Sequence, residues 1–443
     1  MGATCAVPDA GEGKRRHRGG RAARAPAAIV CALVVCSALA GASAPPGRQS
    51  TSGSSGPRSA STLAHHLNAG AQEWHRGPST RTGHRGTAQV QGRPGSAALA
   101  TAFSLVLSIS CPGAADCWAV GHHQDTSTRT FRLVEHWNGV KWRIVDVPSP
   151  PGARHSELSG ISCASVRRCW AVGSYSLQSG SSFAYAERWN GRQWAAVTVP
   201  RPAGALTSDL SRVSCVSAVS CWAVGSASSG PPGAGGLTEH WNGHAWSVVP
   251  SPHVRVPGFL AGVSCLSDTD CWAVGQTGNG SLTEHWNGSA WSVVKTPTSG
   301  KNFDTLGDVS CSAAAACMAV TDLLSSDTFA QRWNGSKWVV TPVVLVGNFP
   351  TLGGVSCTGP SRCWAVGWYM TGTSAKPLAE RWNGTSWKRV AIPSPSDATS
   401  SQAFGVTCLT ARNCWAGGVQ VKTSHAELAL FEHWNGTKWS VVG

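Results

Sequence analysis

Short apolar runs separated by tight turns recur along residues 103–443 of this chain. A representative stretch contains LSGISC (158–163), CWAVGSY (169–175), FAYAERWN (183–190) and QWAAVTV (193–199). The last two runs flank Asn190-Gly191, and Asn-Gly is a strong hairpin signal because both residues tolerate positive φ. The runs are almost continuously apolar, which is typical of strands buried on both faces. The pattern predicts two successive hairpins, or four antiparallel strands, and no long helix.

The same unit recurs seven times, and its clearest marker is a pair of cysteines with five residues between them. The pairs are Cys111 and Cys117, Cys163 and Cys169, Cys215 and Cys221, Cys265 and Cys271, Cys311 and Cys317, Cys357 and Cys363, and Cys408 and Cys414. The first cysteines stand 46 to 52 residues apart, a period that fits a four-stranded propeller blade. We therefore predict an all-β fold, a seven-bladed β-propeller of four-stranded antiparallel blades over residues 101–443.

Tryptophans recur at fixed places in the unit: after the second cysteine, before each Asn-Gly and at the start of each fourth strand. Large flat side chains at constant strand positions are what packing between blades requires. The segments DCWAVG (270–275) and LTEHWNGHAWSVVPSP (237–252) resemble the kelch repeat of kelch and galactose-oxidase-like propellers. Kelch repeats usually carry a Gly-Gly doublet after the second strand, and in that position only Gly417-Gly418 supplies one here. The resemblance implies a propeller, and it covers about three quarters of the chain.

The paired cysteines are predicted to be disulfides that brace the first hairpin of each blade. Cysteines that end one strand and begin its partner face each other, and an exported chain meets an oxidising environment. The alternative is metal binding or redox chemistry. A spacing of five residues matches neither zinc knuckles nor CxxC redox pairs, so we favour disulfides.

The N-terminal part of the chain is predicted to direct export. Basic runs at residues 14–18 and 21–24 precede an uncharged stretch, Ala27 to Ala44, that contains AxA cleavage sites. We favour a signal peptide over residues 1–44, with an uncleaved membrane anchor as the alternative. Residues 45–100 are rich in Ser, Gly and Arg and are predicted to form a disordered linker. The predicted location is extracellular, secreted or tethered to the cell surface.

The net charge of +14 does not indicate nucleic-acid binding. Residues 1–100 hold 12 Lys/Arg against 3 Asp/Glu, so most of the excess lies outside the repeats. A nucleic-acid-binding domain concentrates basic residues on its own folded surface. We predict no nucleic-acid partner, no membrane contact other than the N-terminal segment, and a monomer.

Variation between the copies predicts where a ligand would bind. In an up-and-down blade the cysteine and Asn-Gly turns lie on one face, and the variable loops lie on the other. Function on a repeat scaffold usually sits on its variable loops. The candidate ligand-binding residues there are Trp368, Tyr369, His122, His123 and Asp125. Inward packing of Trp368 and Tyr369, and simple solvation of the two histidines, are the structural alternatives.

Catalytic chemistry is not indicated by any constellation of residues, and we predict no cofactor or metal. Glycosidases need two carboxylates at a controlled separation, whereas the loops offer only scattered Asp125, Glu157, Asp209, Asp304, Asp327 and Asp397. A glutamate recurs before His-Trp or Arg-Trp at positions 135, 187, 239, 284, 380 and 432. Recurrence in six blades favours a bracing hydrogen bond over catalysis.

The function predicted from the sequence is a non-enzymatic propeller that binds an extracellular glycan or protein through its variable-loop face. Two alternatives stay open: a carbohydrate-active propeller enzyme and a purely structural surface module. Two loop carboxylates within about 5 to 10 Å of each other, beside aromatic side chains, would favour the enzyme.

Overall fold

The computed structural model describes residues 103–125, 127–230, 233–252, 257–278, 280–297, 304–322 and 328–442. The predicted signal peptide or anchor (1–44) and linker (45–100) lie outside these ranges, as do Asn279 and Asp327. The described residues form strands, turns and loops without a helix. Accordingly, no helix among them has the length and apolarity needed to cross a bilayer.

Seven consecutive four-stranded units make up the described fold. Units 1 to 4 contain Phe103–Gly113 (β1), Asp116–Gln124 (β2), Thr130–Trp137 (β3), Trp142–Ile144 (β4); His155–Ser165 (β5), Arg168–Ser176 (β6), Ser182–Trp189 (β7), Trp194–Val197 (β8); Thr207–Cys215 (β9), Cys221–Ser228 (β10), Ala234–Trp241 (β11), Trp246–Val248 (β12); and Gly258–Ser267 (β13), Asp270–Thr277 (β14), Gly280–Trp286 (β15), Trp291–Val293 (β16).

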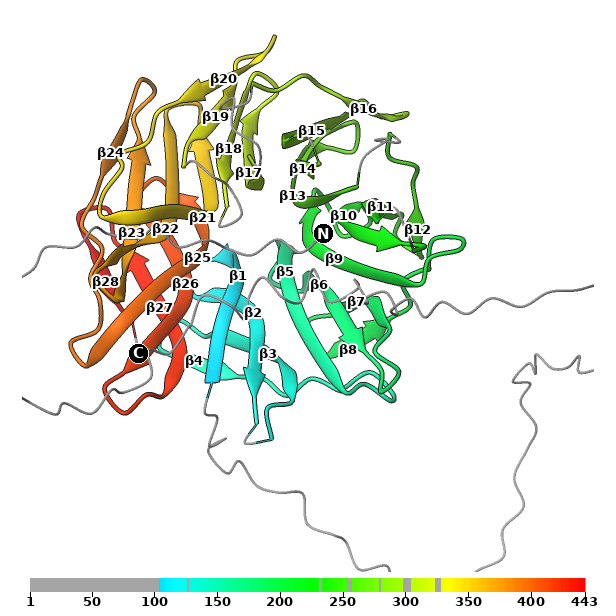
Figure 1. The fold of residues 1–443 in the computed structure, drawn as a ribbon, viewed down its shortest axis with the longest axis horizontal. Coiled ribbons are helices and arrows are strands. Elements are labelled where there is room, and N and C mark those ends of the chain that lie inside the picture. The colour runs from blue at the N-terminus through cyan, green and yellow to red at the C-terminus, as the bar shows by residue number, and fades with distance from the viewer. Residues whose placement is uncertain are drawn as a thin grey trace, which may run out of the picture. The chain divides into compact units, whose positions relative to one another are not determined.

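Units 5 to 7 contain Leu306–Ala313 (β17), Ala316–Thr321 (β18), Ala330–Trp333 (β19), Trp338–Thr341 (β20); Asn348–Gly359 (β21), Arg362–Thr371 (β22), Ser374–Trp382 (β23), Trp387–Arg389 (β24); and Ala398–Thr410 (β25), Asn413–Lys422 (β26), Glu427–Trp434 (β27), Trp439–Val441 (β28). Within every unit, successive strands pair antiparallel. The first strands of the units surround a common centre, and the β-propeller is therefore observed (Figure 1).

Each predicted disulfide is present and lies within its own blade. In blade 2, Cys163 and Cys169 stand directly opposite each other on β5 and β6, with their Cα atoms 4.0 Å apart. Such short covalent loops stabilise a hairpin by restricting the unfolded chain, by roughly 2 to 3 kcal/mol each in the chain-entropy model. The first hairpin of every blade is thus held covalently.

Neighbouring blades are joined by a repeated hydrogen bond at the centre of the ring. The serine before the first cysteine accepts a hydrogen bond from the backbone N–H of the first cysteine of the next blade. The acceptors are Ser110, Ser162, Ser214, Ser264, Ser310 and Ser356, and the N···O distances are 3.0 or 3.1 Å. These bonds fix the height of each blade relative to its neighbour.

The ring closes without exchange of a strand between the first and last blades. β1 packs on β25 and makes a single bridge to β27, in which Phe103 pairs with Glu427. In addition, the backbone N–H of Ala429 donates to Ser104 Oγ at 3.0 Å. Blade packing, with this bridge and this hydrogen bond, therefore closes the ring.

Tryptophan triads form most junctions between blades. The indole that follows the second cysteine of one blade lies against both outer-hairpin indoles of the next blade, with ring centroids 4.6 to 5.5 Å apart. The closing junction has the same form, with Trp415 against Trp137 and Trp142. At the junction of blades 5 and 6, Met318 takes the place of the first indole.

The recurrent glutamates are all buried, but only some of them make the predicted bracing bond. Glu284 accepts from Ser251 Oγ, and Glu380 accepts from the backbone N–H of Val344. Glu239 and Glu432 have no hydrogen-bond partner for either carboxylate oxygen. Burial raises the pKa of Glu239 to about 8, so this side chain is kept largely protonated at neutral pH.

Candidate functional site

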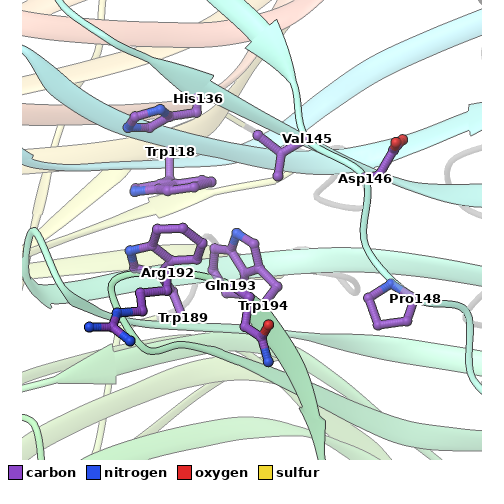
Figure 2. Close-up of a pocket in the computed structure, with 9 residues that line it drawn as sticks. All are labelled: Trp118, His136, Val145, Asp146, Pro148, Trp189, Arg192, Gln193 and Trp194. Atoms are coloured by element: carbon purple, nitrogen blue, oxygen red, sulfur yellow. The ribbon is translucent and has the colours of Figure 1, made fainter. Parts of the chain in front are cut away.

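A groove of about 550 Å³ lies at the rim of the propeller between blades 1 and 2, and Figure 2 shows its lining. Blade 1 contributes β2, the end of β3 and the segment that follows β4, while blade 2 contributes the turn between β7 and β8. Cavities of this size, roughly 300 to 1,000 Å³, are typical of small-ligand sites. We call it the rim groove.

Three indoles form the floor of the rim groove. Trp118 lies against Trp189 and Trp194, with ring centroids 4.7 and 5.2 Å away. Trp118 and Trp194 are almost fully buried, whereas Trp189 is partly exposed. His136 stacks on the opposite side of Trp118 at 4.2 Å, and its Nε2 lies 3.0 Å from Asp116 Oδ1. The floor is therefore apolar, aromatic and held in place by the blade junction (Figure 2).

The edge of the rim groove carries exposed polar side chains of different chemistry. Arg192 offers several N–H donors, Asp146 offers acceptors, and Gln193 offers both. Asp146 belongs to blade 1, whereas Arg192 and Gln193 belong to blade 2, so the two sides of the groove are provided by different repeats. This arrangement suits a ligand with several hydroxyl groups and an apolar face.

The local sequence fixes the backbone of Arg192 and Gln193. Asn190 Oδ1 accepts hydrogen bonds from the backbone N–H groups of Arg192 and Gln193 at 2.9 and 3.0 Å. Gly191 has φ of 91°, a value that favours glycine. The Asn-Gly sequence thus forms the predicted turn and presents the next two residues at the groove.

The sequence prediction placed ligands on the variable-loop face and did not single out the rim groove. Asn-Gly itself is constant, but the two residues after it differ from blade to blade. They are Val140-Lys141, Arg192-Gln193, His244-Ala245, Ser289-Ala290, Ser336-Lys337, Thr385-Ser386 and Thr437-Lys438. A comparison of the copies at these positions was the available signal for the groove.

Trp368 and Tyr369 are neighbours on β22 and point to opposite sides of the strand, as consecutive strand residues do. Trp368 is 6% exposed and packs with Leu105, Phe404 and Val419. Tyr369 packs against the core between blades 5 and 6, and its hydroxyl accepts from Arg389 Nη2 at 2.7 Å. They do not share one aromatic surface, and Trp368 takes the inward packing that was the structural alternative.

His122 and His123 are likewise on opposite sides of β2. His122 stacks on Phe103 at 5.5 Å, and burial lowers its pKa to about 4. His123 stacks on Phe131 at 5.6 Å. Asp125 Oδ1 accepts from the backbone N–H groups of Ser127 and Arg129 and so closes the loop between β2 and β3. Through Phe103, His122 adjoins the apolar cluster that contains Trp368, whereas no described contact links His123 or Asp125 to that cluster.

The structure brings together two of the scattered carboxylates, Glu157 on β5 and Asp209 on β9. Burial raises the pKa of Glu157 to about 7, and the nearby charge of Asp209 adds to this effect. Ser174 and Ser226 donate to Glu157 Oε1 and Asp209 Oδ1 at 3.5 and 2.5 Å. His122 Nδ1 lies 3.8 Å from Glu157 Oε2. Among the described residues, no group of three or more His, Cys, Asp or Glu side chains is arranged to hold a metal ion.

Comparisons with known proteins do not assign a family. No family model matches the chain, and no curated protein does either. Among solved structures, YCF48 bound to D1 peptide is similar with a TM-score of 0.47 and 12% identity, covering 76% of this chain and 93% of that chain. A six-bladed fucose-recognising lectin from Aleuria aurantia has a TM-score of 0.40 and 10% identity, covering 77% and 96%. Likeness of this degree says nothing about the ligand of this chain, and the kelch subtype stays a prediction.

Proposed function

We propose that this protein is an exported, non-enzymatic β-propeller that binds a glycan in the rim groove between blades 1 and 2. The observation that supports the proposal most directly is an aromatic floor bordered by exposed Asp146, Arg192 and Gln193. The sequence also predicted binding of a protein partner through the variable-loop face, and this stays the alternative ligand class for a binding propeller.

The groove chemistry favours a sugar over an apolar ligand. A pyranose ring has an apolar face of C–H groups that packs on an indole, and equatorial hydroxyls that donate and accept hydrogen bonds at its edge. Trp189, the partly exposed indole of the floor, supplies a rigid surface for that face, and Asp146, Arg192 and Gln193 supply donors and acceptors at the edge. An apolar ligand would leave these polar groups unpaired, which costs free energy.

Export is supported by the disulfides together with the N-terminal pattern. Disulfides persist in oxidising compartments and are rare in the cytosol. Every cysteine of the repeats is used in a bond within its blade. A chain that depends on these bonds is suited to work outside the cytoplasm.

The direct test uses the purified propeller on a glycan array, followed by titration of the best ligand. The double variant Arg192→His/Gln193→Ala places the blade 3 turn residues in blade 2. We expect an affinity loss of about tenfold or more, because two hydrogen-bonding side chains are lost or altered. His244→Ala, at the same turn position in blade 3, is the matched control and should leave the affinity unchanged. Equal affinity in the double variant and the wild type would overturn the assignment of the groove.

A carbohydrate-active enzyme is the second candidate, and the pair Glu157 and Asp209 is the observation that favours it. A protonated Glu157 beside a second carboxylate has the components of a general acid and its partner. The test is hydrolysis of a panel of oligosaccharides. Hydrolysis by the wild type that is lost in Glu157→Gln and retained in Arg192→His/Gln193→Ala would favour the enzyme over the non-enzymatic binding protein. Binding in the rim groove without hydrolysis of the bound oligosaccharide would contradict the enzyme hypothesis.

A further inference from the structure

One repeat position faces the centre of the ring and departs from the pattern in two blades. It is the third residue before the first cysteine. The residues there are Ser108, Gly160, Arg212, Gly262, Asp308, Gly354 and Gly405. Five are Gly or Ser, and the remaining two are a cation and an anion in blades 3 and 5.

The glycines at this position are required by the close approach of the next blade. A Cβ added to Gly160 would lie 2.8 Å from the Cα of Arg212, and one added to Gly262 would lie 2.8 Å from the Cα of Asp308. Ser108, Arg212 and Asp308 are each followed around the ring by a glycine. Among the first six blades, a side chain larger than hydrogen is therefore accommodated at this position only in blades 1, 3 and 5. Two of these three side chains, Arg212 and Asp308, are charged.

Arg212 and Asp308 line the same central cavity, which has a volume of about 110 Å³. Its remaining lining is largely aliphatic, including Ile161 and Val263. In this described part of the chain, the guanidinium nitrogens of Arg212 are all more than 4.0 Å from the carboxylate oxygens of Asp308. The two charges therefore border one small cavity without forming an ion pair across it.

Both side chains are held in place by backbone groups, on a neighbouring blade and, for Arg212, also on its own strand. Arg212 Nη1 donates to the carbonyl oxygens of Ser159 and Ser211 at 2.6 and 3.1 Å. Asp308 Oδ2 accepts from the backbone N–H of Val355 at 2.9 Å. Because each charge is fixed on one side of the cavity, little reorganisation is needed for a ligand to enter between them.

Bracing of the blades alone does not require this pair of charges. Ser108 Oγ accepts from the backbone N–H of Ile161 at 3.3 Å, which is the same bond that Asp308 makes to Val355. A neutral serine therefore suffices for the structural bond. The bracing bond alone therefore does not explain a carboxylate in blade 5 or a guanidinium in blade 3.

We propose that the central cavity is a binding site for a small zwitterion of the amino-acid class. The ligand carboxylate would bind the Arg212 guanidinium, and the ligand ammonium group would bind the Asp308 carboxylate. A volume of about 110 Å³ is comparable to that of three or four waters at roughly 30 Å³ each, which suits glycine or alanine better than a larger amino acid. This site is separate from the rim groove and does not depend on the function proposed for it.

Titration calorimetry of the intact propeller with glycine, L-alanine and β-alanine tests the proposal, with acetate and methylammonium as ligands that carry a single charge. We expect saturable binding of a zwitterion, and binding of the singly charged compounds weaker by about tenfold or more. Absence of saturable binding by every amino acid of the panel would overturn the proposal, and water would then be the occupant.

The repeat itself supplies variants that fit the fold. Arg212→Gly and Asp308→Gly introduce the residue found at this position in four other blades, and each should reduce zwitterion affinity by about tenfold or more. His244→Ala, at an exposed turn residue outside the cavity, is the control and should leave the affinity unchanged. Arg212→Met and Asp308→Asn keep side-chain bulk but lack the charge, so they replace any glycine variant whose melting temperature shows that it does not fold. Undiminished affinity in the variants that lack either charge would contradict the assignment.

Discussion

The junction between blades 1 and 2 and the junction between blades 2 and 3 have the same tryptophan framework and different surroundings. In the first, His136 stacks on Trp118 and the groove edge is Asp146, Arg192 and Gln193. In the second, the guanidinium of Arg188 lies over Trp170 and Trp241, at 5.8 and 5.3 Å from their ring centroids.

The recurrent buried glutamate has a cationic partner at the first of these junctions and no hydrogen-bond partner at the second. Arg132 Nε lies 3.1 Å from Glu187 Oε1, with both side chains buried, whereas Glu239 has no partner. The repeated indoles therefore make the junction, and the residues around them decide its charge state and whether a ligand has room. Four predictions follow from that difference, in order of decreasing effect.

Trp194→Ala and Trp246→Ala should each destabilise the propeller by about 3 to 5 kcal/mol, because both indoles are buried in equivalent triads. Equilibrium unfolding in denaturant measures the loss. We expect the two values to agree within about 1 kcal/mol. A much smaller loss for one variant would show that the two frameworks are not equivalent.

Arg132→Met should cost about 3 kcal/mol at neutral pH, because it leaves Glu187 buried without its cation. The loss should shrink as the pH falls, since a protonated Glu187 no longer needs a counter-charge. Unfolding at pH 5 and pH 8 measures both effects. Arg192→Met, at the exposed groove edge, is a control that should not change stability appreciably. A loss independent of pH would contradict the ion-pair account.

Glu239→Gln should remove a pH dependence that the wild type possesses. Glu239 has an ordinary pKa of 4.5 and a folded pKa of about 8. Between these values the folded protein binds more protons than the unfolded chain, so its stability falls as the pH rises, by up to about 1.4 kcal/mol per pH unit. The difference between wild type and variant should slope through this window and be flat below it. A flat difference throughout would mean that Glu239 ionises normally.

Arg188→Ala should have the smallest effect on stability, about 0.5 to 1 kcal/mol, from the loss of the cation–π contacts. It should uncover part of the indoles of the second junction. If the groove edge determines binding, titration of this variant should still give one bound glycan, at the first junction, and none at the second. Binding there would mean that the indoles alone are sufficient.

The blades could be predicted from the sequence because the residues that build them recur at the same positions in successive copies. Cysteines opposite each other, Asn-Gly turns and tryptophans at constant positions predicted the blades, the disulfides and the packing between them. The recurrent glutamates were expected to be structural, and Glu284 and Glu380 make the predicted bond. Glu239 and Glu432 do not, because the segments beside them supply no donor.

The sites were harder to predict because each combines residues from different blades. Arg192 and Gln193 follow a turn that is constant in its Asn-Gly, so their variation was easy to overlook. Arg212 and Asp308 lie in apolar runs almost a hundred residues apart, and only the closed ring places them around one cavity. Trp368 and Tyr369 were predicted to lie in a variable loop, whereas they lie on β22, where alternation along the strand turns them to opposite sides.

The closing junction has a consequence for how this chain can be rearranged. Trp415, Trp137 and Trp142 meet there as the indoles do at most other junctions, so the aromatic packing of the ring continues across its closure. A circular permutant, with the first and last blades fused through a linker and new termini opened after another fourth strand, would retain every triad. Its termini could then be moved around the rim to carry a fused domain beside any chosen blade.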